Sequence, residues 1–218
     1  MSDIFQEVDE EVRRDKALEF WKKHQNLIIA GAALIVLATG GYRFYENRKI
    51  AAEEAAGAAF QHALTLDREG KDADAQTALA ALAANAPHGY QTLARLAGAA
   101  VQGKTDPAGA LAVYDALAAD RSIGPLFQDA AKLRAALLRL DQGDVTATKP
   151  VFEALATPTG AYRFTARLAL GVIAIDASNY TEAGQQLDLI VADPEAPAAE
   201  KRSAESLFGL VAANRPAK

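Results

Sequence analysis

The chain has 218 residues, half of them apolar and 23% charged, which excludes a disordered chain. Its 23 basic and 28 acidic side chains are interleaved at a net charge of −5, which excludes the concentrated positive surface that nucleic-acid binding needs. No cysteine is present, so disulfides, thiolate metal sites and a cysteine nucleophile are excluded as well.

The amino-acid usage predicts an all-α fold that begins with a short amphipathic tail. Alanine dominates the apolar residues and aromatic residues reach only 7%, which favours packed helices over strands. We expect residues 1–23 to form a cytoplasmic amphipathic helix. Its apolar stripe carries Ile4, Phe5, Val8 and Val12, continued by Leu18, Phe20 and Trp21. The spacing suits an interfacial membrane anchor and a cytoplasmic recognition tail equally.

The next element is a predicted transmembrane helix over residues 24–45. Nineteen residues from His24 to Tyr42 carry no formal charge, and the stretch from Leu27 to Ala38 is apolar or small throughout. At a rise of ~1.5 Å per residue, nineteen helical residues reach about 28 Å, which matches the ~30 Å hydrocarbon core of a bilayer. Polar and aromatic residues at both ends suit the headgroup zone.

Two alternatives exist for this segment. A buried helix of a soluble domain would explain the short apolar run with its glycines Gly31, Gly40 and Gly41. A cleaved signal peptide would explain the run length, but its leading region would be over twenty residues long and carry seven acids, whereas signal peptides begin with a short positive region.

The charges that flank the segment predict its orientation. Five basic residues precede it and three follow it closely: Arg13, Arg14, Lys16, Lys22 and Lys23, against Arg43, Arg48 and Lys49. By the positive-inside rule the N-terminus stays in the cytoplasm. Residues 46–218 are then translocated and form a periplasmic domain.

The remainder of the chain repeats itself as four helix-turn-helix units with a final helix. Each unit has a small residue in its first helix, another small residue twelve positions later, a bulky one four further on and an apolar one after three more. The four sets are Ala63, Ala75, Leu79 and Leu82; Gly98, Ala110, Tyr114 and Leu117; Ala136, Thr148, Phe152 and Leu155; and Gly171, Ala183, Leu187 and Ile190. Spacings of four and three lie on one helix face, so each unit is predicted to pack two helices closely.

Turn-forming residues separate the predicted helices. The first helix of each unit runs into Gly70, Gly103, Gly143 or Asn179, residue types that accept a left-handed helix end. Second helices are expected to start at Asp106–Pro107 and at an Asn179–Glu182 capping box, and Pro87, Pro125, Pro158 and Pro194 end the units. A capping helix is predicted over 198–213, with Lys201, Arg202 and Glu205 outward and Leu207, Leu210 and Val211 inward.

This pattern resembles the tetratricopeptide repeat. The matching residues are Gly98 and Gly171 in first helices, Ala75, Ala110 and Ala183 in second helices, Tyr114 and Phe152 at the aromatic position and Pro87 at a unit end. The Trp and first-helix Tyr of that repeat are missing and Thr148 replaces its Ala, so the repeat is described as TPR-like. The predicted fold class is therefore a single N-terminal transmembrane helix followed by a TPR-like α-solenoid.

The layout of residues 17–49 followed by an Ala-rich repeat domain resembles the YfgM-like family of ancillary SecYEG translocon subunits. The resemblance implies a non-enzymatic inner-membrane scaffold whose partners are the SecYEG translocon and periplasmic chaperones. A structural or assembly adaptor of the cell envelope or division apparatus would share this architecture, and a regulatory enzyme subunit is a third alternative.

We find no sequence signal for catalysis, for a cofactor or small-molecule substrate, or for a metal. The three histidines do not pair at ligand spacing, and Asp72 with Asp74 and Asp141 with Asp144 fall at turns, where Asp serves as a cap. Gly103-Lys104-Thr105 lacks the earlier glycine and the preceding strand of a phosphate loop. Arg95, Arg163 and Arg167 lie on first helices and are candidates for recognising acidic partners, although such charges more often keep a surface soluble.

Overall fold

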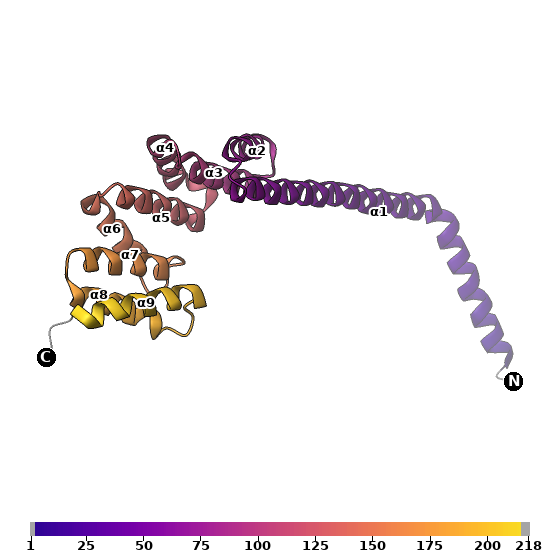
Figure 1. Ribbon diagram of the computed structural model, residues 1–218. Helices are drawn as coiled ribbons and strands as arrows, with labels where there is room; N and C mark the ends of the chain where they lie inside the picture. Colours follow the sequence, from indigo (N-terminus) through magenta and orange to yellow (C-terminus); the bar gives the residue numbers. More distant parts are fainter. Residues whose placement is uncertain (1–2, 215–218) are drawn as a thin grey trace. The chain divides into compact units, whose positions relative to one another are not determined.

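The structure, a computed structural model, describes residues 3–214, except for the side chains of residues 3–12, 17 and 28. Within those residues the regular elements are helices, and the chain divides into two compact units, Met1–Glu54 and Ala55–Lys218. The first unit consists of the N-terminal part of helix α1 (Asp3–Arg68), and the second contains the rest of α1 and all later helices (Figure 1).

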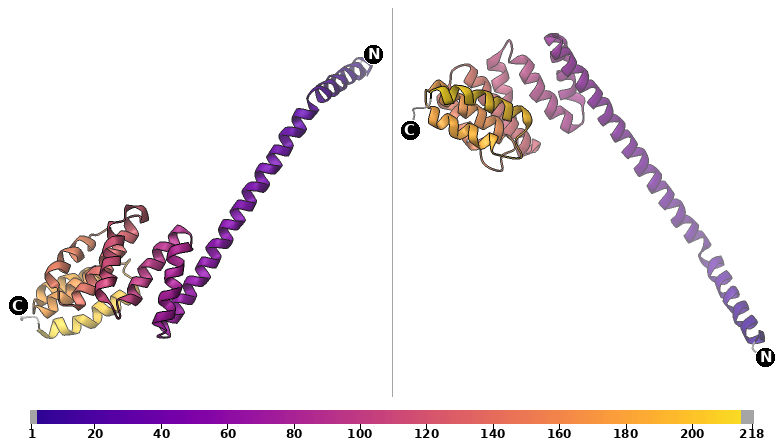
Figure 2. Two further views of the ribbon diagram at one scale, coloured as in Figure 1. Left: turned by 90° about the horizontal axis from the view of Figure 1, so that it is seen from above. Right: turned by 60° about the horizontal axis from the view of Figure 1, so that its bottom comes forward.

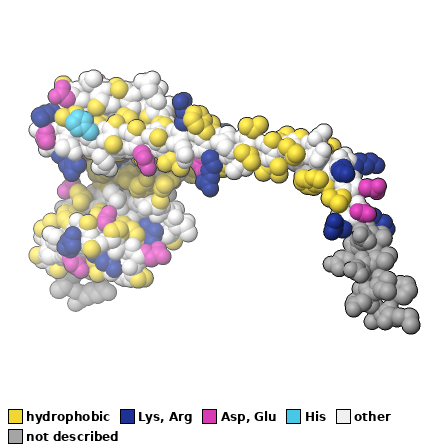
Figure 3. Space-filling model, turned by 90° about the vertical axis from the view of Figure 1, so that its right-hand side faces the viewer, with side chains coloured by type: hydrophobic (Ala, Val, Ile, Leu, Met, Phe, Trp, Pro, Cys, Tyr) yellow, Lys and Arg dark blue, Asp and Glu magenta, His cyan; other side chains and the backbone are white. Residues whose placement is uncertain are grey.

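The first unit exposes its apolar side chains on all sides of the helix. Four consecutive residues, Leu34 to Leu37, are between 65% and 74% exposed, although consecutive helical positions point in different directions. Figure 3 shows the hydrophobic side chains gathered along this stretch of α1. Leu18, Phe20 and Trp21 are exposed too, whereas the side chains of Ile4, Phe5, Val8 and Val12 lie outside the described residues.

The structure does not confirm a single continuous transmembrane helix over residues 24–45. No single helix among the described residues combines the length and hydropathy of a membrane span. The adjoining segments Arg13–Leu27 and Ile29–Arg68, which meet at an angle of 44°, satisfy these requirements only when taken together. The bend lies next to Leu27, at the start of the apolar run.

The second unit is a stack of helical pairs, as the repeat pattern predicts. After α1 come α2 (Asp72–Asn85), α3 (His88–Gln102), α4 (Pro107–Ala119), the short 3-10 helix η1 (Arg121–Ile123), α5 (Pro125–Asp141), α6 (Val145–Leu155), α7 (Arg163–Asp176), α8 (Tyr180–Val191) and α9 (Ala198–Asn214). From α2 onward each α-helix packs on the next, and the end of α1 shares a core with α2 and α3 (Figure 2). Contacts between neighbours are the organisation of an α-solenoid.

The four-residue register that defines the repeats forms the core of this unit. Every position of the register is buried in every hairpin, including the fully enclosed Ala63, Leu117 and Phe152. Thr148 stands where the other second helices have Ala, and its buried hydroxyl donates to the Asp144 carbonyl at 2.9 Å. The hydroxyl is therefore satisfied inside its own helix, which lets Thr occupy a core position.

The first helices end in two ways. Gly70, Gly143 and Ser178 have positive φ values of 75°, 85° and 58°. Each is followed by a residue whose N–H reaches back five residues, as when Asp144 donates to Arg139, which completes a Schellman motif. The predicted left-handed ends at Gly103 and Asn179 are wrong, because Gly103 remains helical at φ −59° and Ser178 takes the left-handed place before Asn179.

The second helices begin at side-chain caps. Asp106, Asp144 and Asn179 each accept a hydrogen bond from the backbone N–H three residues on, at 2.9, 3.0 and 3.2 Å. Glu182 accepts from the Asn179 side chain instead of its backbone, so the predicted capping box is only half formed. Asp72 does not cap α2; its carboxylate binds a lysine instead.

Helix α9 covers the end of the array as predicted, but its inner face is rotated. Ala204 and Val211 are buried, and Leu207 and Phe208 pack against the same cluster. Leu210 is 48% exposed, which corrects its predicted inward position. Ala204 lies 33 residues after Gly171, so α9 repeats the small-residue position of a first helix.

Candidate functional site

The first helices of the hairpins line a groove of about 500 Å3. Its walls come from the end of α1, from α3 and α5, and from the start of α7, all within the second unit. The lining residues are Phe60, Leu64, Asp67, Leu93, Leu96, Ala97, Ala100, Val101, Ala130, Leu133, Arg134, Leu137, Tyr162 and Thr165. Along α1, α3 and α5 the lining positions recur every three or four residues, about one helical turn, so each of these helices contributes one stripe to the groove.

The groove is mainly apolar, with a few polar groups on its walls. Phe60, Leu64 and Leu137 are half-buried and leave part of their side chains in contact with the open space. Polar groups come from Asp67, Arg134, Tyr162 and Thr165. An apolar cleft with a small number of polar groups is the usual form of a binding site for a ligand or a peptide segment.

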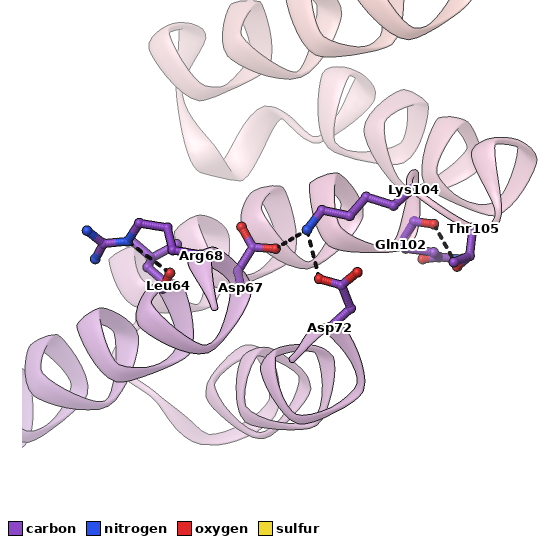
Figure 4. Close-up of polar contacts among 7 residues, drawn as sticks. All are labelled: Leu64, Asp67, Arg68, Asp72, Gln102, Lys104 and Thr105. Carbon is purple, nitrogen blue, oxygen red and sulfur yellow. Dashed lines mark hydrogen bonds and ion pairs between the residues drawn. The ribbon is translucent and has the colours of Figure 1, made fainter. Parts of the chain in front are cut away.

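Asp67, which lines the groove, belongs to an ion-pair cluster with Lys104 and Asp72. The Lys104 ammonium donates to both carboxylates at 2.7 Å, joining the end of α1, the start of α2 and the loop after α3 (Figure 4). Hydrogen bonds from Lys104 to these carboxylates raise the pKa of Lys104 above its ordinary value. The sequence Gly103-Lys104-Thr105 is therefore part of a structural contact and forms no phosphate loop.

Arg134 is exposed and lies on the α5 wall. It also lines an adjoining hollow of about 250 Å3 that shares Ala100 and Leu137 with the groove. Its positive charge influences the tyrosine hydroxyls on either side. Burial raises the pKa of both Tyr162 and Tyr114, and the negative charge of Asp129 raises that of Tyr162 further. The Arg134 guanidinium acts in the opposite direction and lowers the pKa of both tyrosines.

The three arginines that the sequence suggests for partner recognition are engaged within the chain. Arg95 pairs with Asp120 at 3.6 Å. Arg163 pairs with Asp193 and Glu195 and lies over the ring of Phe164. Arg167 is buried and donates to the Leu189 carbonyl at the end of α8. Each of these three guanidinium groups therefore already has a partner within the chain.

Arg134 and Tyr162 were not identified from the sequence, although the repeat register contains a signal for Arg134. Some groove positions recur at the same offset from the small residue of two first helices: Phe60 and Leu133 lie three positions before it, and Leu96 and Arg134 two before it. The offset of Leu96 therefore predicts a groove position at Arg134. Tyr162 precedes α7 and has no equivalent in the other hairpins.

The described residues hold no group of three His, Cys, Asp or Glu side chains arranged to bind a metal ion. Every shifted carboxylate or lysine pKa in that part of the chain has a local hydrogen bond or ion pair as its largest cause. Such shifts accompany caps and surface ion pairs, so they do not identify an acid or base for catalysis.

The sequence was also compared with known proteins. The pattern of the tetratricopeptide repeat-like domain family matches residues 18–151, which is more than half of the chain. Neither the curated proteins nor the solved structures contain a significant match. The stacked hairpins, their shared register and this match agree, and the chain belongs to the tetratricopeptide repeat-like domain family.

Proposed function

We propose that this protein is a membrane-anchored scaffold that binds segments of other proteins in the groove between its first helices. The observation that carries the proposal is the groove itself, an apolar surface left open along a repeat domain whose own core is complete. Repeat families of this kind bind other proteins on their extended surfaces without catalysing a reaction, and the proposal includes no catalytic step.

The anchor in this proposal is the segment at residues 24–45. A helix that is apolar on every side needs an apolar environment on every side, and side chains such as Leu27 and Leu37 are about three-quarters exposed in the isolated chain. A bilayer supplies that environment. The basic residues before the segment favour a cytoplasmic N-terminus and a periplasmic repeat domain.

The resemblance to YfgM-like proteins supports a more specific role. In that role the inner-membrane anchor places the repeat domain beside the SecYEG translocon, and the groove links it to periplasmic chaperones. The family match supports protein binding in general, and the identity of these partners rests on the resemblance alone.

Two experiments on the full-length protein in bacterial cells test the proposal. A reporter active only outside the cytoplasm, fused after Lys218, is expected to be active; activity of a cytoplasmic reporter instead would contradict the orientation. A photo-crosslinking residue at Ala100, an exposed groove position, is expected to capture SecYEG or a periplasmic chaperone.

The matched control places the crosslinker at Ala81, an exposed position on α2 that lines none of the hollows described above. Equal capture from Ala81 and Ala100 would show that the groove is not the binding surface. Capture of division or envelope-assembly proteins from Ala100 would replace the translocon role with that of an envelope adaptor.

A further inference from the structure

Arg134 differs from the other arginines of the first helices α3, α5 and α7. Arg95, Arg139, Arg163 and Arg167 all have partners within the chain: Asp120, Asp115, two acidic residues before α9 and the Leu189 carbonyl. Among the described residues, Arg134 forms no ion pair and donates no hydrogen bond to another side chain or carbonyl. Its guanidinium is therefore available to a ligand.

Among the described residues, no acidic side chain forms an ion pair with Arg134. Asp67, which lines the groove, is bound to Lys104 at 2.7 Å, and Asp129 is bound to Lys132 at 2.8 Å. Asp141 lines the adjoining hollow together with Arg134 but forms no ion pair with it. The Arg134 guanidinium thus has no ion-pair partner in a groove that is mainly apolar.

The surroundings of Arg134 determine what would bind there. Ala100 and Leu137 flank it in both hollows, so a chain that fills the groove passes over the guanidinium. An entirely apolar segment would remove water from this charge without replacing its hydrogen bonds, which is unfavourable. A carboxylate replaces them with two parallel N–H···O bonds and matches the charge.

We infer that Arg134 is a specificity-determining residue of the groove, which selects apolar peptide segments that carry an Asp or Glu side chain. The inference rests on the proposed function, because it requires the groove to bind peptides. It adds the chemistry of the partner, namely apolar side chains for the groove walls and one carboxylate for Arg134.

The first test is selection of random phage-displayed peptides on the full-length protein in detergent. Wild type is expected to enrich apolar peptides containing an Asp or Glu, and Arg134→Gln is expected to enrich apolar peptides without that acid. Arg121→Gln is the matched control, because it removes the same charge from an exposed position in η1 outside the groove. Equal enrichment of acids by wild type and Arg134→Gln would overturn the inference.

The second test measures the affinity of one selected peptide and of its Glu→Gln version by fluorescence anisotropy. Wild type and Arg121→Gln are expected to bind the acidic peptide about fivefold to tenfold more tightly, and Arg134→Gln is expected to bind both equally. A preference that survives in Arg134→Gln would overturn the inference.

A third variant separates this inference from the proposed function. Ala100→Trp fills the groove and is expected to abolish binding of the selected peptides, whereas Ala81→Trp is expected to leave it unchanged. Binding that Ala100→Trp blocks, with no preference for an acid, overturns only the role of Arg134. Peptides that bind Ala100→Trp as well as wild type overturn both proposals.

Discussion

The small residue in each first helix determines how closely two helices approach. Alanine fills this position at Ala63 and Ala136, where it is fully enclosed, and glycine fills it at Gly98 and Gly171. A methyl group added at Gly98 would lie 3.7 Å from Leu79 Cβ, an ordinary contact distance, whereas at Gly171 it would lie 3.2 Å from Leu187 Cδ2. The same register position therefore leaves enough space for a methyl group at Gly98 but not at Gly171.

This difference predicts opposite effects of one substitution. Gly98→Ala is expected to raise the free energy of unfolding by about 0.5 to 1 kcal/mol, because alanine loses less conformational freedom in a helix. Gly171→Ala is expected to lower it by about 1 kcal/mol, since the enclosed Leu187 cannot move aside without strain. Thermal unfolding of the full-length chain by circular dichroism measures both, and a gain in both variants would show that Leu187 repacks freely.

At the scale of elements, the Asp106 cap makes the stability of the start of α4 depend on pH. Its carboxylate accepts from the Gly109 N–H and from Gln102 Nε2, both at 2.9 Å, and these bonds lower the pKa of Asp106. Because the folded pKa lies below the unfolded one, the stabilisation is complete above the unfolded pKa of about 4. It is lost as the pH falls through the folded pKa.

We therefore expect Asp106→Ala to lower the Tm at neutral pH and to match wild type more closely at about pH 3. Asp106→Asn is the control, because an asparagine oxygen keeps the helix cap but does not titrate in this range. A Tm difference between Asp106→Ala and wild type that stays constant over this pH range would contradict the role of the ionised carboxylate.

A second prediction at this scale concerns the Lys104 contact. Lys104 joins three segments, so Lys104→Gln leaves Asp67 and Asp72 facing each other without a cation. We expect a lower Tm at low salt and a smaller loss at high salt, because the pair is exposed and screened by ions. Lys132→Gln, which breaks an ion pair within α5, is the control and is expected to change the Tm less. Equal losses in both variants would show that Lys104 does not join the segments.

The sequence predicts the helices and their buried faces well. It predicts less well where the helices end and which charged side chains have no partner within the chain. Residues spaced four apart lie on one helix face, so the spacing predicts which residues are buried. Ala110 and Tyr114 are an example, since both are buried. The turn signals predict that Asn179 both ends α7 and begins α8, but one residue cannot take both conformations, so Ser178 supplies the left-handed turn. Whether Arg95 or Arg134 is free depends on partners distant in sequence, which spacing does not reveal.

At the scale of the whole chain, the repeat continues beyond the family match. The match ends at residue 151, yet α7 and α8 keep the same register and Ala204 begins it once more in α9. Helix α9 therefore begins the register of a further first helix. Repeat arrays need a terminal element with a polar outer face, and Arg202 and Glu205 supply that face.

The proposed anchor leads to a prediction about membrane insertion. The unbroken apolar run is only twelve residues long and the segment contains three glycines, so little free energy favours its transfer into lipid. An arginine at the centre of such a segment costs about 2.5 to 3.5 kcal/mol. Ile35→Arg is therefore expected to move the protein out of the membrane fraction and to silence a C-terminal periplasmic reporter.

The control for this prediction lies in the same helix. Ile50 is also exposed, but it lies outside residues 24–45, so Ile50→Arg is expected to leave membrane fractionation and reporter activity unchanged. Both variants add the same charge and remove the same apolar side chain from α1, which makes position relative to the predicted span the only difference being tested. If Ile35→Arg fractionated like wild type, the apolar surface of α1 would need a partner other than lipid, and the proposed periplasmic placement of the groove would lose its support.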